Sequence, residues 1–509
     1  MANQQQNNQL IAKNTLLLYI RMFLTMSISL YTSRIILKIL GIEDYGIYSV
    51  VGGIITMFTF INSAMISATQ RFITFAIGNN DLEQLKKVFT SSLQIHGIIS
   101  LIILLLGETI GLWFLYEKMI IPETRMNAAL WVYQCSIISC IITIMSAPYN
   151  ADIIAHEKMS AFAYISIIEV TLKLAIVYLL MVIPYDKLIT YAFLILLTQL
   201  LIRSSYTHYC HKHFEESKYK HKIEKKILKE MASFAGWSFW GNLANILYTQ
   251  GLNIMLNIFF GPTVNAARGI AVQVQTAVGQ FVGNFQMALN PQITKNYAKG
   301  DLEQMHLLMF RSARFSFFLL YFLVLPILLE LKFILKLWLD NYPKDTIIFT
   351  QIILCISLLY SLTGNCVIAN QATGKVKVFQ ITVGSILLLV LPISYIFLNL
   401  GYPPYSVFII HFIIELIAQT ARIILLKRQI YLPIKKHFIH VYKYVGIVII
   451  TSSILPLVIH SYLEEGWIRF CFVGISCILS IGCSIFFLGL TKGEREFFTH
   501  KILLFKHTR

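Results

Sequence analysis

Asp-Leu-Glu-Gln at residues 81–84 recurs as Asp-Leu-Glu-Gln at residues 301–304, shifted by 220 along the numbering. The same shift, without a gap, carries Gly41 onto Gly261 and Ser92 onto Ser312. A four-residue match alone can arise by chance, but several matches in one register, each between apolar runs, indicate a duplication. The sequence therefore predicts two related halves of one membrane body, an arrangement typical of transporters.

The composition places this body in lipid. Hydrophobic residues make up 57% of the 509 residues and charged residues only 13%, whereas soluble domains carry about 25% charge. Apolar runs of about 20 residues, each long enough to cross the hydrocarbon core, recur along the whole chain. We expect an all-α integral membrane protein with about 14 transmembrane helices, arranged as two parallel six-helix repeats and two C-terminal helices.

The apolar runs and the polar stretches between them divide the chain into six parts. These are a tail at 1–13, a six-helix bundle at 14–210, a basic linker at 211–232, a second six-helix bundle at 233–428, two additional transmembrane helices at 429–492 and a tail at 493–509.

Positive charge predicts the orientation. The net charge is +17, and Lys and Arg gather at the N-terminal side and in every second loop after it. By the positive-inside rule we expect both termini in the cytoplasm. The basic segment 218–229 suits acidic lipids on that face, and we expect no nucleic-acid partner.

Signatures of enzymes, metal sites and cofactors are missing from the sequence. The eight cysteines form no C-x-x-C pair, and no G-x-x-x-x-G-K-[ST] loop is present. The longest outward loop, 108–125, is too small for a catalytic domain. We therefore expect no catalytic residues, no metal site and no cofactor, so that energy comes from the substrate's own downhill flow or from a gradient of H⁺ or Na⁺.

Polar side chains follow one face of the predicted seventh span, residues 234–259, at steps of three and four. They are Ser238, Asn242, Asn245, Thr249, Asn253 and Asn257. Subtracting 220 places Thr25, Ser29 and Ser33 at the matching positions of the first span. We interpret both stripes as the lining of a shared cavity; the alternative is hydrogen bonding between packed helices.

The predicted eighth span, residues 265–289, is unusually rich in amides. Gln273, Gln275, Gln280, Asn284 and Gln286 are costly in hydrocarbon unless water, a hydroxyl-rich ligand or a neighbouring helix satisfies them. The pattern favours a carbohydrate-sized polar cargo over an apolar drug, although packing between helices would account for part of it.

Three of the arginines within predicted spans lie in the first and eighth spans. A guanidinium donates two parallel hydrogen bonds to a phosphate, so Arg21, Arg34 and Arg268 are candidate ligands of an anionic headgroup. Arg21 lies too deep to reach the interface easily. Snorkelling to lipid headgroups is the alternative for Arg34 and Arg268.

Other charges within the spans are candidates for ion coupling. Glu169 and Lys173 stand four residues apart, which equally fits a self-contained ion pair. Glu415 lies one turn after His411 and two turns before Arg422; a buried carboxylate beside an imidazole suits proton transfer, and pairing with Arg422 through water is the alternative.

Three segments resemble the O-antigen and capsular polysaccharide flippases of the multidrug/oligosaccharidyl-lipid/polysaccharide exporter superfamily, a MATE-like group. They are Gly-Ile-Glu-Asp-Tyr-Gly at 41–46, Pro-Tyr-Asn-Ala-Asp-Ile-Ile-Ala-His-Glu-Lys-Met at 148–159 and Asn-Pro-Gln-Ile at 290–293. The resemblance implies a V-shaped pair of six-helix bundles with alternating access in the bacterial cytoplasmic (inner) membrane. The implied cargo is an undecaprenyl-pyrophosphate-linked oligosaccharide, and the implied partners are membrane lipids, a polysaccharide polymerase and a chain-length regulator.

Three other functions stay open at this point. A peptidoglycan-precursor flippase carries the same lipid pyrophosphate. A cation-coupled drug antiporter of the same superfamily would need an acidic cavity, and a membrane-embedded polymerase would need a catalytic loop.

Overall fold

A computed structural model describes residues 2–117, 119, 121–218, 224–339 and 342–496. Helices form almost all of these residues, and no strand occurs among them. Eleven helices in the described part are long and apolar enough to cross a membrane. The all-α membrane class is confirmed, while the count of 14 stays a prediction, because α1 (Ala2–Gly78) and the amide-rich α8 (Pro262–Ala298) are not among the eleven.

The chain forms two compact units. The first unit contains Met1–Phe239 and Thr294–Asp301, and the second contains Trp240–Ile293 and Leu302–Arg509. The division falls within α7 (Lys225–Phe260) and near the end of α8. The first residues of α7, which include part of the basic stretch expected to be a linker, and the last residues of α8 therefore belong to the first unit.

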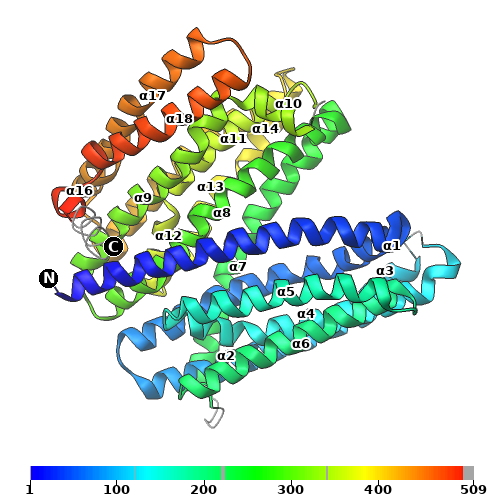
Figure 1. Ribbon diagram of the computed structural model, residues 1–509. Helices are drawn as coiled ribbons and strands as arrows, with labels where there is room; N and C mark the ends of the chain where they lie inside the picture. Colours follow the sequence, from blue (N-terminus) through cyan, green and yellow to red (C-terminus); the bar gives the residue numbers. More distant parts are fainter. Residues whose placement is uncertain (1, 118, 120, 219–223, 340–341, 497–509) are drawn as a thin grey trace, which may run out of the picture. The chain divides into compact units, whose positions relative to one another are not determined.

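The first unit is built on α1, a helix of 77 residues that is interrupted only at Gly41, where φ is 78° and ψ is 170°. The helices α2, α4, α5 and α6 pack against one another and against α1 (Figure 1). Their core includes Val132, Tyr133 and Ile137. The helices of this unit after α1 are α2 (Leu82–Leu106), η1 (Gly107–Gly111), α3 (Leu112–Glu117), η2 (Glu123–Arg125), α4 (Met126–Ala155), α5 (Met159–Val182) and α6 (Lys187–His213).

The longest outward loop expected from the sequence, 108–125, is in large part helical. The π-helical turn η1 continues α2 into α3, and the Tyr133 hydroxyl donates a hydrogen bond of 2.7 Å to the Gly107 carbonyl. The expectation of a loop was wrong for the first half of this segment, which is helical. The contact that holds it comes from α4, a helix that begins only after the whole expected loop.

In the second unit, α15 and α9 each contact several neighbouring helices. Val278 and Val282 of α8 join Leu320 and Val324 of α9 and Leu354 of α11 in one buried cluster. The helices after α8 are α9 (Leu302–Leu329), α10 (Leu331–Leu339), α11 (Thr346–Ser361), α12 (Gly364–Thr373), α13 (Lys377–Leu388), α14 (Val390–Asn399), α15 (Ser406–Ile430), α16 (Ile434–His437), η3 (Phe438–Lys443), α17 (Tyr444–Tyr462), α18 (Trp467–Ser484) and η4 (Ile485–Gly489).

The last two long helices, α17 and α18, lie side by side and pack on α9 (Figure 1). Buried ion pairs join α18 to the residue after α9, and the segment after η4 to the middle of α9. Arg469 binds both oxygens of Glu330 at 2.9 and 3.3 Å, and Arg314 binds both oxygens of Glu494 at 2.6 Å. Because a buried charge that loses its partner is costly, these pairs fasten α18 and the segment after η4 to α9 and the residue that follows it.

Candidate functional site

In the second unit, Arg268 of α8 is held by α7. Its side chain is buried, at 9% exposure. One terminal nitrogen donates to the side-chain oxygen of Asn253, and the other donates to the Thr249 carbonyl at 2.9 Å. Snorkelling of Arg268 was therefore the wrong alternative, because its charge is held inside the unit by oxygens of the neighbouring helix.

Thr249 and Asn253 belong to the polar stripe of α7, and both are partly exposed. The Thr249 hydroxyl donates to the Asn245 carbonyl at 2.8 Å, and the Asn253 amide donates to Gln250 at 3.3 Å. Asn245 is exposed and Asn242 is partly exposed on the same helix. The stripe is thus anchored at Arg268 and open along part of its length, and its role as a substrate lining stays a prediction.

The amides of α8 divide into two kinds. Gln275 donates to the Ser357 hydroxyl of α11 at 2.8 Å, and Gln286 donates to Ser316 of α9 at 3.3 Å. Gln273 and Gln280 are not buried. Hydrogen bonds between helices, the alternative expected for such residues, account for Gln275 and Gln286, so Gln280 is better placed than Gln275 as a substrate-binding glutamine on this helix.

In the first unit, Arg21 of α1 packs on α5. Its guanidinium lies 4.6 Å from the centre of the Phe162 ring, a distance at which the face of the ring attracts a cation. Tyr206 of α6 lies close enough to interact electrostatically with Arg21. Arg21 is therefore positioned among three helices and is still partly exposed.

The other first-unit candidates are less constrained. The Thr25 hydroxyl donates to the Met22 carbonyl of its own helix at 3.1 Å, and Ser29 is exposed. The Arg34 side chain lies outside the described residues.

Both candidate coupling carboxylates form direct ion pairs. Glu169 accepts from Lys173 at 2.6 Å, with both side chains about one-third exposed. Glu415 and Arg422 pair at 2.5 Å with both side chains buried, so the expectation of pairing through water was wrong. His411 lies against Tyr248 of α7, with ring centres 5.1 Å apart. The pairs leave the role of these carboxylates in coupling a prediction.

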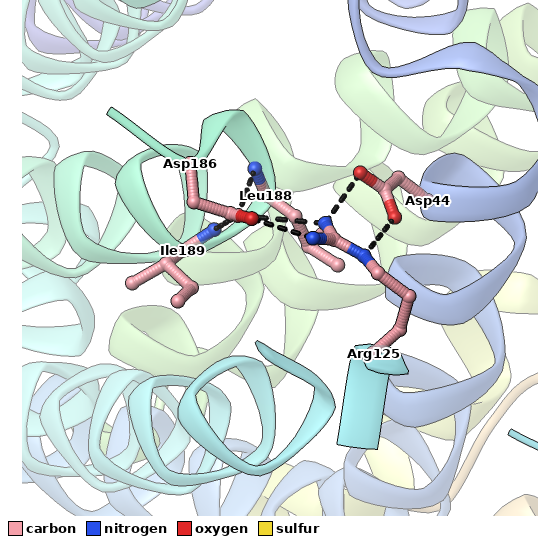
Figure 2. Close-up of polar contacts among 5 residues, drawn as sticks. All are labelled: Asp44, Arg125, Asp186, Leu188 and Ile189. Carbon is pink, nitrogen blue, oxygen red and sulfur yellow. Dashed lines mark hydrogen bonds and ion pairs between the residues drawn. The ribbon is translucent and has the colours of Figure 1, made fainter. Parts of the chain in front are cut away.

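Sequence reasoning missed a charged cluster at the start of α4. Figure 2 shows Arg125 between two carboxylates: it donates to both oxygens of Asp44 at 2.5 and 2.8 Å and to Asp186 at 2.5 Å. Asp186 also accepts from the backbone N–H groups of Leu188 and Ile189 at the start of α6. The cluster ties α1, α4 and α6 together. No local sequence pattern predicts this cluster, because its members lie far apart in the sequence.

One group of described residues offers the chemistry of a metal site. Asp152, His156 and Glu216 each present a ligand atom, and these atoms lie within 4.8 Å of one another. The group lies at the opposite end of α4 from Arg125. The expectation that the chain has no metal site stays a prediction.

Comparison of the fold with solved structures defines the class of protein. A MATE transporter in the straight conformation superposes with a TM-score of 0.71 at 13% identity, over 84% of this chain and 96% of that one. An outward-facing multidrug resistance MATE family transporter of the MOP superfamily gives 0.69 at 16% identity, over 83% and 97%. A MOP superfamily transporter from Pyrococcus furiosus gives 0.66 at 15% identity, over 83% and 97%. The chain has the MATE-like fold.

Sequence comparison then places the chain more narrowly. The family model described as polysaccharide biosynthesis protein matches residues 11–297, more than half of the chain, and the chain belongs to this family. It is 20% identical over 281 residues to the uncharacterized membrane protein EpsK of Bacillus subtilis (strain 168), and the match spans about half of each chain, 55%. The family, the fold and the apolar helices of the described part together indicate a multi-pass membrane protein, as the sequence predicted.

Proposed function

We propose that this protein moves undecaprenyl-pyrophosphate-linked oligosaccharide repeat units, as used for O-antigen, capsule or exopolysaccharide, from the cytoplasmic to the periplasmic leaflet of the inner membrane. Membership in the polysaccharide biosynthesis family supports a sugar cargo. Alternating access between the two repeats is the mechanism that the MATE-like fold favours.

The observation that carries the proposal is the state of Arg268. This buried cation is oriented by Asn253 and the Thr249 carbonyl, both neutral, and its Nε has no hydrogen-bond partner in the described part of the chain. A buried guanidinium that is oriented but not neutralised is suited to an anionic ligand. In a lipid-linked sugar, the pyrophosphate is that anion.

The physical task of such a transporter is confined to the head of the lipid. The bilayer already solvates the polyprenyl tail, so the barrier to crossing comes from the pyrophosphate and the sugars. In our proposal Arg21 and Arg268 offset the phosphate charge. The accessible hydroxyls and amides, among them Ser29, Asn245 and Gln280, exchange hydrogen bonds with the sugar in place of water.

A drug antiporter for cations is disfavoured by the same residues. The charges on the candidate substrate positions are guanidinium groups, and the carboxylate Glu415 is neutralised by Arg422. A precursor flippase for peptidoglycan is chemically closer, because it carries the same lipid pyrophosphate. We expect that depletion of the protein abolishes a surface glycan without loss of viability, which separates these two functions.

The test uses a strain that lacks the gene and carries variants on a plasmid. Arg21→Ala should leave the amount of protein in the membrane unchanged and stop surface glycan assembly, while Arg21→Lys should retain more activity than Ala and less than wild type. Arg428→Ala, at an exposed arginine near the end of α15, is the matched control and should assemble normal glycan. Unchanged glycan in Arg21→Ala, or efflux of cationic dyes from proteoliposomes, would count against the proposal.

A further inference from the structure

The carboxylate of Asp152 lies at the end of α4 in an unusual state. Its side chain is fully buried, at 0% exposure, and neither of its oxygens accepts a hydrogen bond from a donor among the described residues. An ionised carboxylate that is buried without a hydrogen-bond donor is strongly unfavourable. Such a group needs a cation or a proton nearby.

Two further ligand groups face Asp152. The Nε2 atom of His156 lies 3.7 Å from Asp152 and 2.6 Å from Glu216, whose side chain is also buried. The three groups bring together two carboxylates and one imidazole. With Asp152 and Glu216 both ionised, a protonated His156 supplies one positive charge within this group against two negative charges.

The backbone holds these ligands in place. The His156 N–H donates to the Asp152 carbonyl at 3.0 Å, which sets His156 one turn after Asp152. The chain then turns through Glu157, at a φ of 60°, and the Lys158 N–H donates to the Ile153 carbonyl at 3.0 Å. The His156 ring stacks on Phe214 at 4.2 Å and 9°. Glu216 lies in the short segment after α6, where Ser217 is fully buried and donates to the Phe214 carbonyl at 2.9 Å.

We propose that Asp152, His156 and Glu216 form a structural site for a divalent metal ion, which fastens the segment after α6 to the end of α4. Two carboxylate oxygens and one imidazole nitrogen suit Zn²⁺ or Mn²⁺ better than Ca²⁺ or Mg²⁺, which prefer oxygen ligands only. The metal supplies two positive charges to two carboxylates. Binding replaces the hydrogen bond between His156 Nε2 and Glu216, whose 2.6 Å spacing must widen to admit metal–ligand bonds of about 2.1 Å, whereas the 3.7 Å between His156 and Asp152 already admits them.

The site does not depend on the transport proposal. It belongs entirely to the first unit and lies at the opposite end of α4 from the Arg125 cluster. Arg21 and Arg268 are not part of it. Loss of the metal therefore affects the stability of the first unit in the purified protein whatever the cargo is.

The experiment uses the full-length protein, purified in detergent with a tag that contains no histidine. After treatment with a chelator, its Tm is measured during titration with Zn²⁺, Mn²⁺ or Ca²⁺, and bound metal is measured by mass spectrometry. Wild type should bind one equivalent of Zn²⁺ or Mn²⁺ and gain several degrees in Tm. Asp152→Asn and Glu216→Gln should bind at least tenfold more weakly.

Matched controls stand beside the ligands. Glu215→Gln and His213→Gln change exposed residues and should bind metal as the wild type does. If none of the ions raises the Tm of the wild type by more than it raises the Tm of Glu216→Gln, the metal site is refuted. A rise in Tm for metal-free Asp152→Asn without any metal effect on the wild type would instead show that Asp152 and Glu216 share a proton.

Discussion

Gly41 and Gly261, which occupy matching positions of the two repeats, adopt the same φ of 78°. Each ends a helical segment, Gly41 within α1 and Gly261 between α7 and α8. Asn80 and Gly300, related by the same shift along the numbering, both have positive φ as well, at 55° and 75°. The repeat in the sequence thus includes the turns between helices, and each half contains its own copy of these turns.

A first prediction concerns these glycines. An added Cβ at Gly41 or Gly261 meets no atom within 4 Å, so the cost of alanine is backbone strain alone. We expect Gly41→Ala, whose φ and ψ fall in a region reserved almost entirely for glycine, to destabilise by about 1–3 kcal/mol, and Gly261→Ala by about 1 kcal/mol. Thermal unfolding of the purified protein measures both.

The control is Gly474→Ala in α18, where an added Cβ also meets no atom but the backbone is helical. Its Tm should stay equal or rise slightly. Equal losses at all three glycines would show that positive φ is not the cause.

The repeat also explains where sequence reasoning succeeded. The duplication and the helical class are encoded in local patterns, so one constant shift and a set of apolar runs suffice to predict them. After the fourth helix of each half, Glu157 and Gly374 both adopt positive φ, but their numbers differ by 217 rather than by 220. The shift between the two halves therefore changes from 220 to 217 somewhere between residues 80 and 157. A comparison at one constant shift cannot align the residues beyond that point.

Partners across helices could not be foreseen in the same way. Arg21 corresponds to Gly241 in the repeat, and a Cβ at Gly241 would lie 1.9 Å from the side chain of Gln380. In the first half, Arg21 of α1 packs on Phe162 of α5. In the second half, Gln380 of α13 lies against Gly241 of α7 instead. The pattern along one helix predicts which face is polar, but only the packed neighbours decide which side chain fills the space.

A second prediction concerns the orientation of Arg268. Asn253→Ala removes the side-chain oxygen that accepts from Arg268, and a hydrogen bond to a charged group is worth about 1.5–3 kcal/mol. If orientation of Arg268 matters for transport, flipping of a lipid-linked oligosaccharide in proteoliposomes should fall at least tenfold. Arg268→Lys should fall between wild type and Arg268→Ala, because an ammonium lacks the planar fork.

The matched control is Asn257→Ala, one turn further along α7 and exposed. We expect its flipping rate to lie within twofold of wild type. A comparable loss in Asn257→Ala would mean that the stripe acts as a whole and that Arg268 has no special part.

A third prediction concerns the Arg125 cluster and pH. Partial burial alone would raise the pKa of Asp186, but hydrogen bonds from Arg125 and from the Ile189 and Leu188 N–H groups hold this pKa below its usual value. The stabilisation is therefore fully present above the unfolded pKa of about 3.9 and is lost as the pH falls through the folded pKa. We expect Arg125→Gln to lower the Tm at pH 7 by an amount equivalent to about 1 kcal/mol and to flatten the decline in Tm below pH 5.

Glu123→Gln serves as the control for this cluster, because Glu123 is an exposed carboxylate in the same turn. Its curve of Tm against pH should follow that of the wild type. A wild-type Tm that stays constant from pH 5 to pH 3 would show that Asp186 contributes nothing through Arg125.

A fourth prediction separates stability from coupling at Glu415 and Arg422. Both side chains are buried and the pair is 2.5 Å apart, so removal of one charge leaves the other uncompensated. Glu415→Gln should cost about 3–5 kcal/mol, whereas the double variant Glu415→Gln with Arg422→Met should recover most of this loss. Because Arg422 neutralises Glu415 directly, we expect the double variant to flip its cargo at close to the wild-type rate and to respond to a proton or sodium gradient in the same way as the wild type. If the double variant regains its Tm but loses all dependence on the gradient that drives the wild type, then Glu415 carries the coupling ion and the pair is part of the transport cycle.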